Sequence, residues 1–132
     1  MITKDRVNDR DLTIGIVGLG YVGLPTAIGF HDAGFNIVGL DISEQVINSL
    51  QRGENPGDDP AFDDSIPIDE RWGVTTDPKE AIPLCDVIIV TVPTPVMEDH
   101  RPDLRFVQSA GESIFENINR EKRPVVILES TV

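Results

Sequence analysis

Three glycines, Gly18, Gly20 and Gly23, follow directly after the apolar run Leu12–Val17 and give the segment GIVGLGYVGLP. An apolar strand, a glycine-rich turn and a helix are the parts of a dinucleotide-binding βαβ unit. The first glycine permits a tight turn, the second lets backbone approach a pyrophosphate, and the third lets the helix pack closely. The sequence therefore predicts that residues 18–23 bind a dinucleotide, with Leu19, Tyr21 and Val22 completing the turn.

Asp41 ends a second apolar run, Phe35–Leu40, some 20 residues after the glycines, where the ribose acceptor of such a unit is expected. Its carboxylate would accept hydrogen bonds from the ribose hydroxyls of NAD and repel the 2′-phosphate of NADP. No basic residue follows before Arg52. Ser43 can cap the next helix, which would leave Asp41 free for the ribose. We therefore predict that the cofactor is NAD.

The rest of the chain alternates short apolar runs with helical patterns, which indicates an α/β domain with a doubly wound, Rossmann-like parallel sheet. We expect residues 1–11 to be a loosely ordered polar tail and residues 12–132 to be one NAD-binding domain. The expected strand order is 3-2-1-4-5. After the second strand we expect helices over 43–52, 77–82 and 104–118, and strands over 72–76, 87–92 and 124–128. The last helix should bury Phe106, Val107, Ala110, Ile114, Phe115 and Ile118.

That order places a topological switch point between strands 1 and 4, and ligands bind beside the carboxyl ends of strands at such a point. The carboxyl ends of the strands form one edge of the sheet, the rim. Two polar strand exits would join the glycines and Asp41 on this rim. The first is Val92–Pro95 (VPTP), in which Pro93 fixes the backbone and the Thr94 hydroxyl faces the cofactor. The second is Glu129–Thr131, whose short side chains could position a water or a substrate hydroxyl. Alone, the first could be only a rigid strand exit and the second only a helix cap.

Composition limits the partners. The chain has 132 residues with 23 acidic and 11 basic side chains, a formal net charge of −12. Such a charge disfavours binding to nucleic acid and to anionic membranes. No apolar run reaches membrane-spanning length, and the charged first eleven residues do not form a signal peptide. One cysteine excludes a disulfide within the chain and favours a reducing, cytoplasmic setting.

Several reactive residues are expected to have no role at the site. Cys85 opens the fourth strand and is interpreted as a buried structural thiol. His31 is expected on the surface, and His100 in a loop near the rim without a ligand contact. The loop between residues 53 and 70 is acidic, and a solvated loop is commoner than a metal site. No metal site is therefore predicted; the acids concerned are Asp58, Asp59, Asp63 and Asp64.

Taken together, the motifs resemble those of a known family. GIVGLGYVGLP, Asp41, TTD at 75–77, VPTP at 92–95, PDL at 102–104 and ESTV at 129–132 occur in this order. The combination resembles the amino-terminal, NAD-binding domain of the UDP-glucose/GDP-mannose dehydrogenase family, the nucleotide-sugar 6-dehydrogenases, over residues 12–132. LPTA at 24–27, DHRPD at 99–103 and LEST at 128–131 are most similar to the UDP-N-acetyl-D-mannosamine dehydrogenase branch.

The resemblance implies oxidation of the C6 alcohol of a UDP-sugar to a carboxylate, with two NAD reduced, through an aldehyde and a thioester on a cysteine. Gly18–Gly23, Asp41, Thr94 and Thr131 would contact NAD. Glu129 and Thr131 would lie near the nicotinamide and assist catalysis. The family's catalytic cysteine, central helix and sugar-nucleotide domain correspond to nothing in these 132 residues. We therefore expect that this chain binds NAD weakly, is inactive alone, and forms the family's homodimer only at full length.

Three other interpretations stay open from the sequence. UDP-glucose could be the substrate. The chain could be the cofactor domain of a β-hydroxyacid dehydrogenase, which shares the opening turn but usually lacks VPTP followed by PDL and EST. A non-catalytic NAD(H)-sensing module is the third, and gel filtration with and without NADH would distinguish it.

Overall fold

The structure, a computed structural model, describes residues 1–57, 66–92, 97–101 and 103–129. The first half of the chain contains α1 (Lys4–Asn8), β1 (Thr13–Val17), α2 (Gly23–Asp32), β2 (Asn36–Leu40) and α3 (Glu44–Gln51). The second half contains β3 (Trp72–Thr75), α4 (Pro78–Ala81), the 3₁₀ turn η1 (Ile82–Leu84), β4 (Val87–Val90), α5 (Arg105–Asn117), the 3₁₀ turn η2 (Arg120–Lys122) and β5 (Val125–Leu128).

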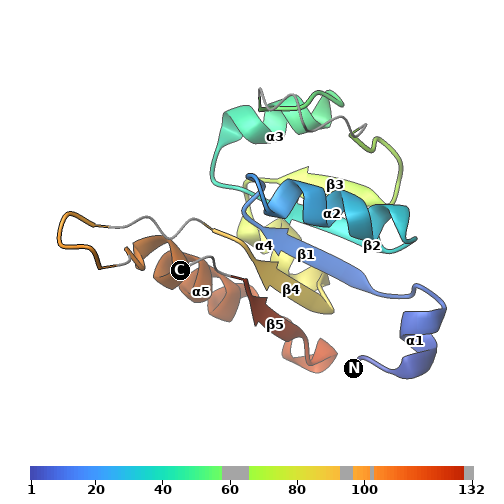
Figure 1. Cartoon of the computed structure of the whole chain (residues 1–132). Coiled ribbons are helices and arrows are strands. Elements are labelled where there is room, and N and C mark those ends of the chain that lie inside the picture. Colours follow the sequence, from blue (N-terminus) through green and yellow to red (C-terminus); the bar gives the residue numbers. More distant parts are fainter. Residues whose placement is uncertain (58–65, 93–96, 102, 130–132) are drawn as a thin grey trace.

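The five strands form one parallel sheet in the order β3-β2-β1-β4-β5, which confirms the predicted fold class and order (Figure 1). Helices α2 and α3 cover one face, and α4 and α5 cover the other. Because all strands are parallel, their carboxyl ends lie on one edge of the sheet. The chain leaves β1 and β4 in opposite directions at this edge, so the switch point lies between these two strands.

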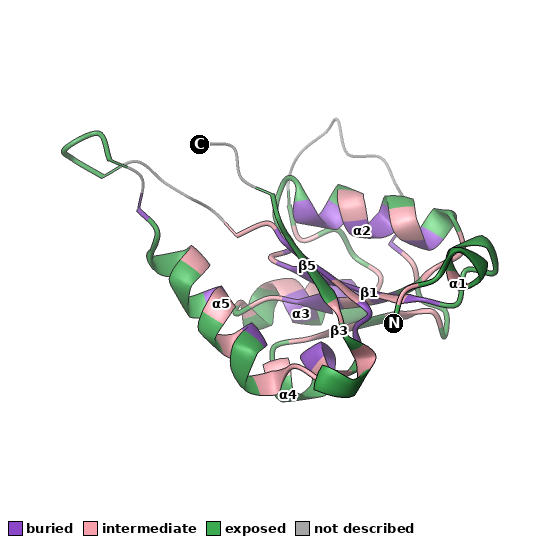
Figure 2. Ribbon diagram, turned by 90° about the horizontal axis from the view of Figure 1, so that it is seen from below, coloured by how far each residue is buried: buried purple, intermediate pink, exposed green. Residues whose placement is uncertain are grey.

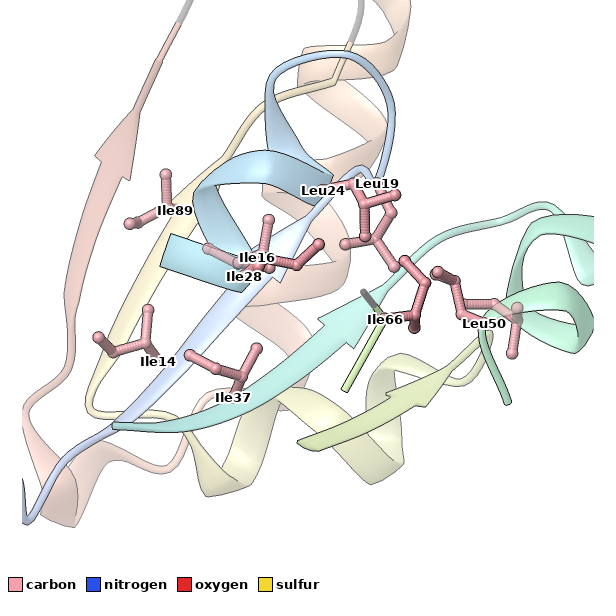
Figure 3. Packing of buried hydrophobic residues seen from close by; sticks show 11 residues of the cluster. Ile14, Ile16, Leu19, Leu24, Ile28, Ile37, Leu50, Ile66 and Ile89 are labelled. Carbon is pink, nitrogen blue, oxygen red and sulfur yellow. The ribbon is translucent and has the colours of Figure 1, made fainter. Parts of the chain in front are cut away.

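The larger core cluster lies between the sheet and helices α2 and α3 (Figure 3). Alternate residues of β1 contribute Ile14 and Ile16, and α2 contributes Leu24, Ala27 and Ile28 at helical spacing. These side chains are almost fully excluded from water, so the packing of α2 on β1 holds the start of α2 against the sheet.

The second cluster lies on the opposite face, where Ala81, Ile82 and Ile88 pack with Ala110 and Ile114 of α5. Cys85 belongs to this cluster.

The Cys85 thiol is confirmed as a buried structural group. Its Sγ donates a hydrogen bond to the carbonyl of Ala81 at 3.2 Å, and burial raises the pKa of the thiol to about 12. A Cβ placed on Gly15 would lie 2.5 Å from this sulfur, so β1 and the thiol are in close contact. A thiol with so high a pKa is protonated and unreactive at neutral pH.

Local signals in the sequence correctly predicted several helix ends. Gly34 follows α2 with a φ of +103°, a conformation that glycine adopts without strain. The hydroxyl of Ser43 accepts a hydrogen bond from Val46 N–H and caps α3. Asp77 caps α4 through Lys79 N–H, and Pro78 occupies the first helical position.

The first eleven residues are not a loosely ordered tail, and the sequence prediction is wrong on this point. They contain α1, which Thr3 caps by accepting a hydrogen bond from Arg6 N–H. The Arg6 guanidinium also donates to the buried carboxylate of Asp86, 3.2 Å away. This contact joins residues that are far apart in sequence, so the pattern of nearby residues could not reveal it.

The predicted buried face of α5 is also partly wrong. Ala110 and Ile114 are buried as expected, but Phe106 is exposed and Phe115 is 79% exposed. The reason is that α5 packs mainly against α4 and η1, through the line of the helix that carries Ala110 and Ile114. The neighbouring edge strand β5 is exposed along its whole length, with all four side chains 46–56% accessible, as the green strand in Figure 2 shows.

Candidate functional site

The glycine-rich turn lies at the switch point, between the carboxyl end of β1 and the start of α2. Gly18 has a φ of +96° and donates its N–H to the carbonyl of Leu40 at 2.8 Å. No side chain in the described part of the chain caps α2. Within the described residues, the N–H groups of Gly20, Tyr21, Val22 and Gly23 have no acceptor. Unpaired N–H groups at the positive end of a helix dipole are suited to bind an anion such as a pyrophosphate.

The second and third glycines have different surroundings. A Cβ on Gly23 would collide with the carbonyl of Gly18 and would lie 2.5 Å from the hydroxyl oxygen of Thr91. A Cβ on Gly20 would meet no atom of the described residues within 4 Å. The third glycine is therefore required by the fold itself, whereas the second faces open space that a ligand could enter.

Leu19 and Tyr21, which lie inside the turn, also differ. The side chain of Leu19 is buried in the core beside Leu24, and its N–H donates to Asp41 (Figure 3). Tyr21 is 87% exposed, and Val22 is also exposed. Among these predicted cofactor contacts, Leu19 supports the turn from within, whereas Tyr21 and Val22 are exposed.

Asp41 lies at the end of β2 and connects two segments of the rim. Its Oδ2 accepts the N–H of Leu19 at 2.8 Å, and its Oδ1 accepts the N–H of Ser43 at 2.9 Å. The expectation that capping by Ser43 leaves Asp41 free is therefore only partly correct. A carboxylate has about four lone-pair sites, so two remain for ribose hydroxyls.

Sequence reasoning missed Ile42, the next residue. It is 85% exposed and lies beside Asp41 at the rim. The position of an isoleucine directly after the predicted ribose acceptor is the only signal in the sequence, and its exposure is what the structure adds.

The strand exits bring Thr91, which the sequence analysis did not single out, and further predicted residues to the same rim. Thr91 follows β4, donates its N–H to Val17, and donates its hydroxyl to the carbonyl of Gly18 at 2.7 Å. Val92 packs against the second core cluster. Glu129 is exposed and donates its N–H to Val90 at 2.9 Å. Pro93, Thr94 and Thr131, also predicted for the site, lie outside the described residues.

The comparisons with known proteins agree with this geometry. The family model for the NAD binding domain of the UDP-glucose/GDP-mannose dehydrogenase family matches residues 12–132. The chain belongs to the UDP-glucose/GDP-mannose dehydrogenase family. Its cofactor is accordingly NAD. This membership decides against a β-hydroxyacid dehydrogenase.

Similar relatives include the UDP-N-acetyl-D-mannosamine dehydrogenase of Salmonella typhi, which is 38% identical over 90% of this chain and 28% of its own length. Among solved structures, a GDP-mannose dehydrogenase from Pseudomonas aeruginosa is similar with a TM-score of 0.77 and 31% identity, over 90% of this chain and 28% of that chain. The UDP-N-acetyl-mannosamine dehydrogenase of Staphylococcus aureus is similar with a TM-score of 0.75 and 33% identity, over 91% and 29%. This chain therefore spans less than a third of each relative.

His31 is not a surface residue, and the sequence prediction is wrong. It is only 7% exposed, and its Nε2 lies 2.9 Å from both carboxylate oxygens of Asp69. Its ring also contacts Trp72 edge-on, with 5.8 Å between centroids. The hydrogen bond from His31 is the main reason that the pKa of Asp69 is lowered. The end of α2 faces the segment before β3 here, so this histidine joins two elements away from the rim.

The remaining motifs divide between structural contacts and undescribed residues. In the TTD motif, Thr75 donates its hydroxyl to Glu80 and accepts the N–H of Asp77, so the motif forms the corner between β3 and α4. His100 is exposed, in a loop over 97–101 that projects away from the domain (orange in Figure 1).

Asp58, Asp59, Asp63 and Asp64 lie outside the described residues. Within the part of the chain that is described, no three His, Cys, Asp or Glu side chains gather to hold a metal ion. No helix over the described ranges has both the length and the apolar character needed to cross a membrane.

Proposed function

We propose that this chain provides the NAD-binding part of a nucleotide-sugar dehydrogenase that oxidises the C6 alcohol of a UDP-sugar to a carboxylate with two NAD. The observation that carries the proposal is the row of unpaired N–H groups at Gly20–Gly23, placed beside the Asp41 carboxylate on one rim. Both features suit one dinucleotide, whose pyrophosphate needs donors and whose adenosine ribose needs an acceptor.

The described residues fit NAD in a consistent order along the rim. The N–H groups of the turn would hold the pyrophosphate, and the remaining lone pairs of Asp41 would accept the ribose hydroxyls. Ile42 would offer apolar contact to the adenosine. The local donors are needed because a chain with a net charge of −12 otherwise repels an anionic cofactor. When bound, NAD supplies the hydride acceptor for oxidation of the sugar alcohol.

At the nicotinamide end we propose contacts from the exits of β4 and β5. Thr94 and Thr131 would contact the cofactor. Glu129 and Thr131 would assist catalysis by positioning a water or a substrate hydroxyl. Support comes from the place of Glu129, whose exposed side chain follows β5 directly and lies on the same rim as the glycine turn.

We propose UDP-N-acetylmannosamine as the preferred substrate, with UDP-glucose as the alternative. The support is the 38% identity to UDP-N-acetyl-D-mannosamine dehydrogenases. Because the relatives are more than three times longer, we propose that the 132 residues alone do not turn over substrate and that dimerisation needs the remaining polypeptide. The buried, free Cys85 is compatible with the reducing cytoplasm that we propose as the location.

NADH fluorescence titration tests the binding proposal. We expect saturable binding, weakened roughly tenfold or more in Asp41→Ala, because hydrogen bonds to a charged group are lost. Asp77→Ala is the matched control, since Asp77 caps α4 through Lys79 N–H and has no part in the glycine turn. Equal affinities of the wild type and Asp41→Ala would contradict the ribose assignment.

Two further measurements test the proposed inactivity of this chain and its oligomeric state. Incubation with NAD and a UDP-sugar should produce no NADH, and turnover by this chain alone would overturn the proposed inactivity. Gel filtration should give the same elution volume with and without NADH. A change of oligomeric state on adding NADH would favour the sensing module instead.

A further inference from the structure

The peptide unit between Gly18 and Leu19 is held at both ends. Its carbonyl oxygen, from Gly18, accepts the hydroxyl of Thr91 at 2.7 Å. Its N–H, from Leu19, donates to the Asp41 carboxylate at 2.8 Å. One partner follows β4 and the other follows β2, so the two strands that flank β1 together fix this peptide plane.

This restraint acts where the backbone has most freedom. Gly18 has a φ of +96°, and glycine populates positive and negative φ about equally. Without hydrogen bonds at its two ends, the peptide plane that follows Gly18 could rotate. Residues 20–23, whose N–H groups have no acceptor among the described residues, follow Leu19 directly, so this plane sets the direction in which their backbone starts.

The Thr91 side chain lies directly against the turn. An ideal Cβ on Gly18 would be 3.2 Å from the Thr91 hydroxyl oxygen, and one on Gly23 would be 2.5 Å from it. The same hydroxyl lies 3.2 Å from the carbonyl of Val17. Thr91 therefore lies against both the first and the third glycine.

We propose that Thr91 is a positioning residue for NAD. Its hydroxyl holds the Gly18 carbonyl toward β4, which keeps that carbonyl away from the anion and keeps the N–H groups of residues 20–23 aligned. The inference rests on the proposed binding of the NAD pyrophosphate at this turn. Thr91 acts only through the backbone of Gly18, whereas Asp41 holds the Leu19 N–H and would also accept the ribose hydroxyls.

Substitutions at position 91 separate the hydroxyl from the shape of the side chain. Thr91→Val keeps the branched shape and removes the donor, which leaves the Gly18 carbonyl without this partner. Thr91→Ser keeps the donor and removes a methyl group. Thr13→Val is the matched control, because it makes the same replacement of a hydroxyl by a methyl group at the other end of β1.

The experiment titrates NADH and ADP-ribose, which carries the pyrophosphate but no nicotinamide, and records thermal unfolding of each variant. We expect Thr91→Val to weaken both ligands by roughly five- to twentyfold, as for the loss of one hydrogen bond. Thr91→Ser should stay within about twofold of the wild type, as expected if the donor is what matters. Thr13→Val should leave both affinities unchanged.

The outcomes separate this inference from the proposed function. If the wild type does not bind NADH or ADP-ribose, the NAD-binding proposal fails first. If the wild type binds and a folded Thr91→Val binds equally well, the positioning role is wrong. If Thr91→Ser loses as much ligand affinity as Thr91→Val does, the effect comes from packing, and the role of the hydroxyl is wrong. If Thr91→Val is unfolded, Thr91→Ala takes its place with the same expectations.

Discussion

Arg6 and Asp86 join the amino-terminal helix to the base of the sheet. Nη2 of Arg6 lies 3.2 Å from Oδ1 of Asp86, whose other oxygen accepts the N–H of Thr13 at 2.9 Å. Lys122 lies 3.8 Å from the same carboxylate. Asp86 is buried, so the two hydrogen bonds and the nearby Lys122 cation compensate a charge that has lost its water. The contact is at the amino ends of β1 and β4, opposite the rim that carries the proposed NAD site.

Asp86→Ala should therefore lower the free energy of unfolding without changing NADH affinity. We expect a loss of about 2–4 kcal/mol, because Thr13 N–H and two cations lose their partner. Urea unfolding at pH 7 measures the loss, and titration of the folded variant measures the affinity. Arg6→Ala should cause a smaller loss, since the Thr13 N–H still donates to the carboxylate and the Lys122 cation still lies near it. Unchanged stability in Asp86→Ala would show that this contact does not hold the base of the sheet.

The second and third glycines of the turn should respond differently to alanine. Gly23→Ala should destabilise the fold by about 1–3 kcal/mol, because a methyl group there collides with the Gly18 carbonyl and the Thr91 hydroxyl. Gly20→Ala should leave stability nearly unchanged and weaken NADH binding, because its methyl group enters only the open space of the turn. Urea unfolding and NADH titration of both variants distinguish the two effects.

Gly29→Ala is the control for Gly20→Ala. Gly29 lies inside α2 with open space around it, so alanine should stabilise the helix by up to about 1 kcal/mol. NADH affinity should not change. If Gly20→Ala binds NADH as tightly as Gly29→Ala does, the cofactor does not approach the turn at Gly20.

The fold could be predicted because its signals are local. Strand and helix patterns alternate, and Gly34, Ser43 and Asp77 end or begin helices by short-range hydrogen bonds. The wrong predictions concern long-range contacts. His31 has the pattern of a polar residue at a helix end, and only the approach of Asp69 makes it buried. The pairing of Arg6 with Asp86 is likewise invisible in the sequence.

The sequence predicted that the glycine turn and Asp41 lie together, but not the hydrogen bonds that join them. The glycines and Asp41 have a known spacing, so sequence alone placed them together. The double hydrogen bond of Asp41 to Leu19 and Ser43 depends on how closely β2 approaches the turn. Thr91 has no signal of its own, because a threonine at the end of a buried strand usually indicates only β propensity.

Asp103 gives a prediction for the pH dependence of stability. Hydrogen bonds from the Arg105 side chain, and then from the Arg105 N–H, lower the pKa of Asp103 from 3.8 to about 2. Because the pKa of Asp103 is lower in the folded than in the unfolded state, the ionised carboxylate stabilises the fold. This stabilisation is complete above the pKa of the unfolded state and is lost as the pH falls through about 2. Asp103→Asn should therefore be less stable than the wild type at pH 6, and the difference should narrow between about pH 4 and pH 2.

Urea midpoints at pH 6, 4 and 2.5 measure this narrowing. Asp99→Asn is the matched control, because Asp99 pairs with Arg101 inside the projecting loop and anchors no helix. Asp99→Asn should change the urea midpoint less than Asp103→Asn does at every pH. A gap between Asp103→Asn and the wild type that stays constant over this range would contradict the role of the ionised carboxylate at the start of α5.

The edge strand β5 provides the last prediction. Val126 is about half exposed, whereas Val90, in the adjacent strand, is buried. Val90→Ala should cost about 2 kcal/mol or more, because it removes two buried methyl groups and leaves a cavity. Val126→Ala should cost less than half of that. Val126→Lys should reduce aggregation measured by light scattering, because a charge on an exposed edge strand opposes pairing between chains. If Val126→Ala costs as much as Val90→Ala, and the cost depends on protein concentration, β5 is buried in solution by association of chains.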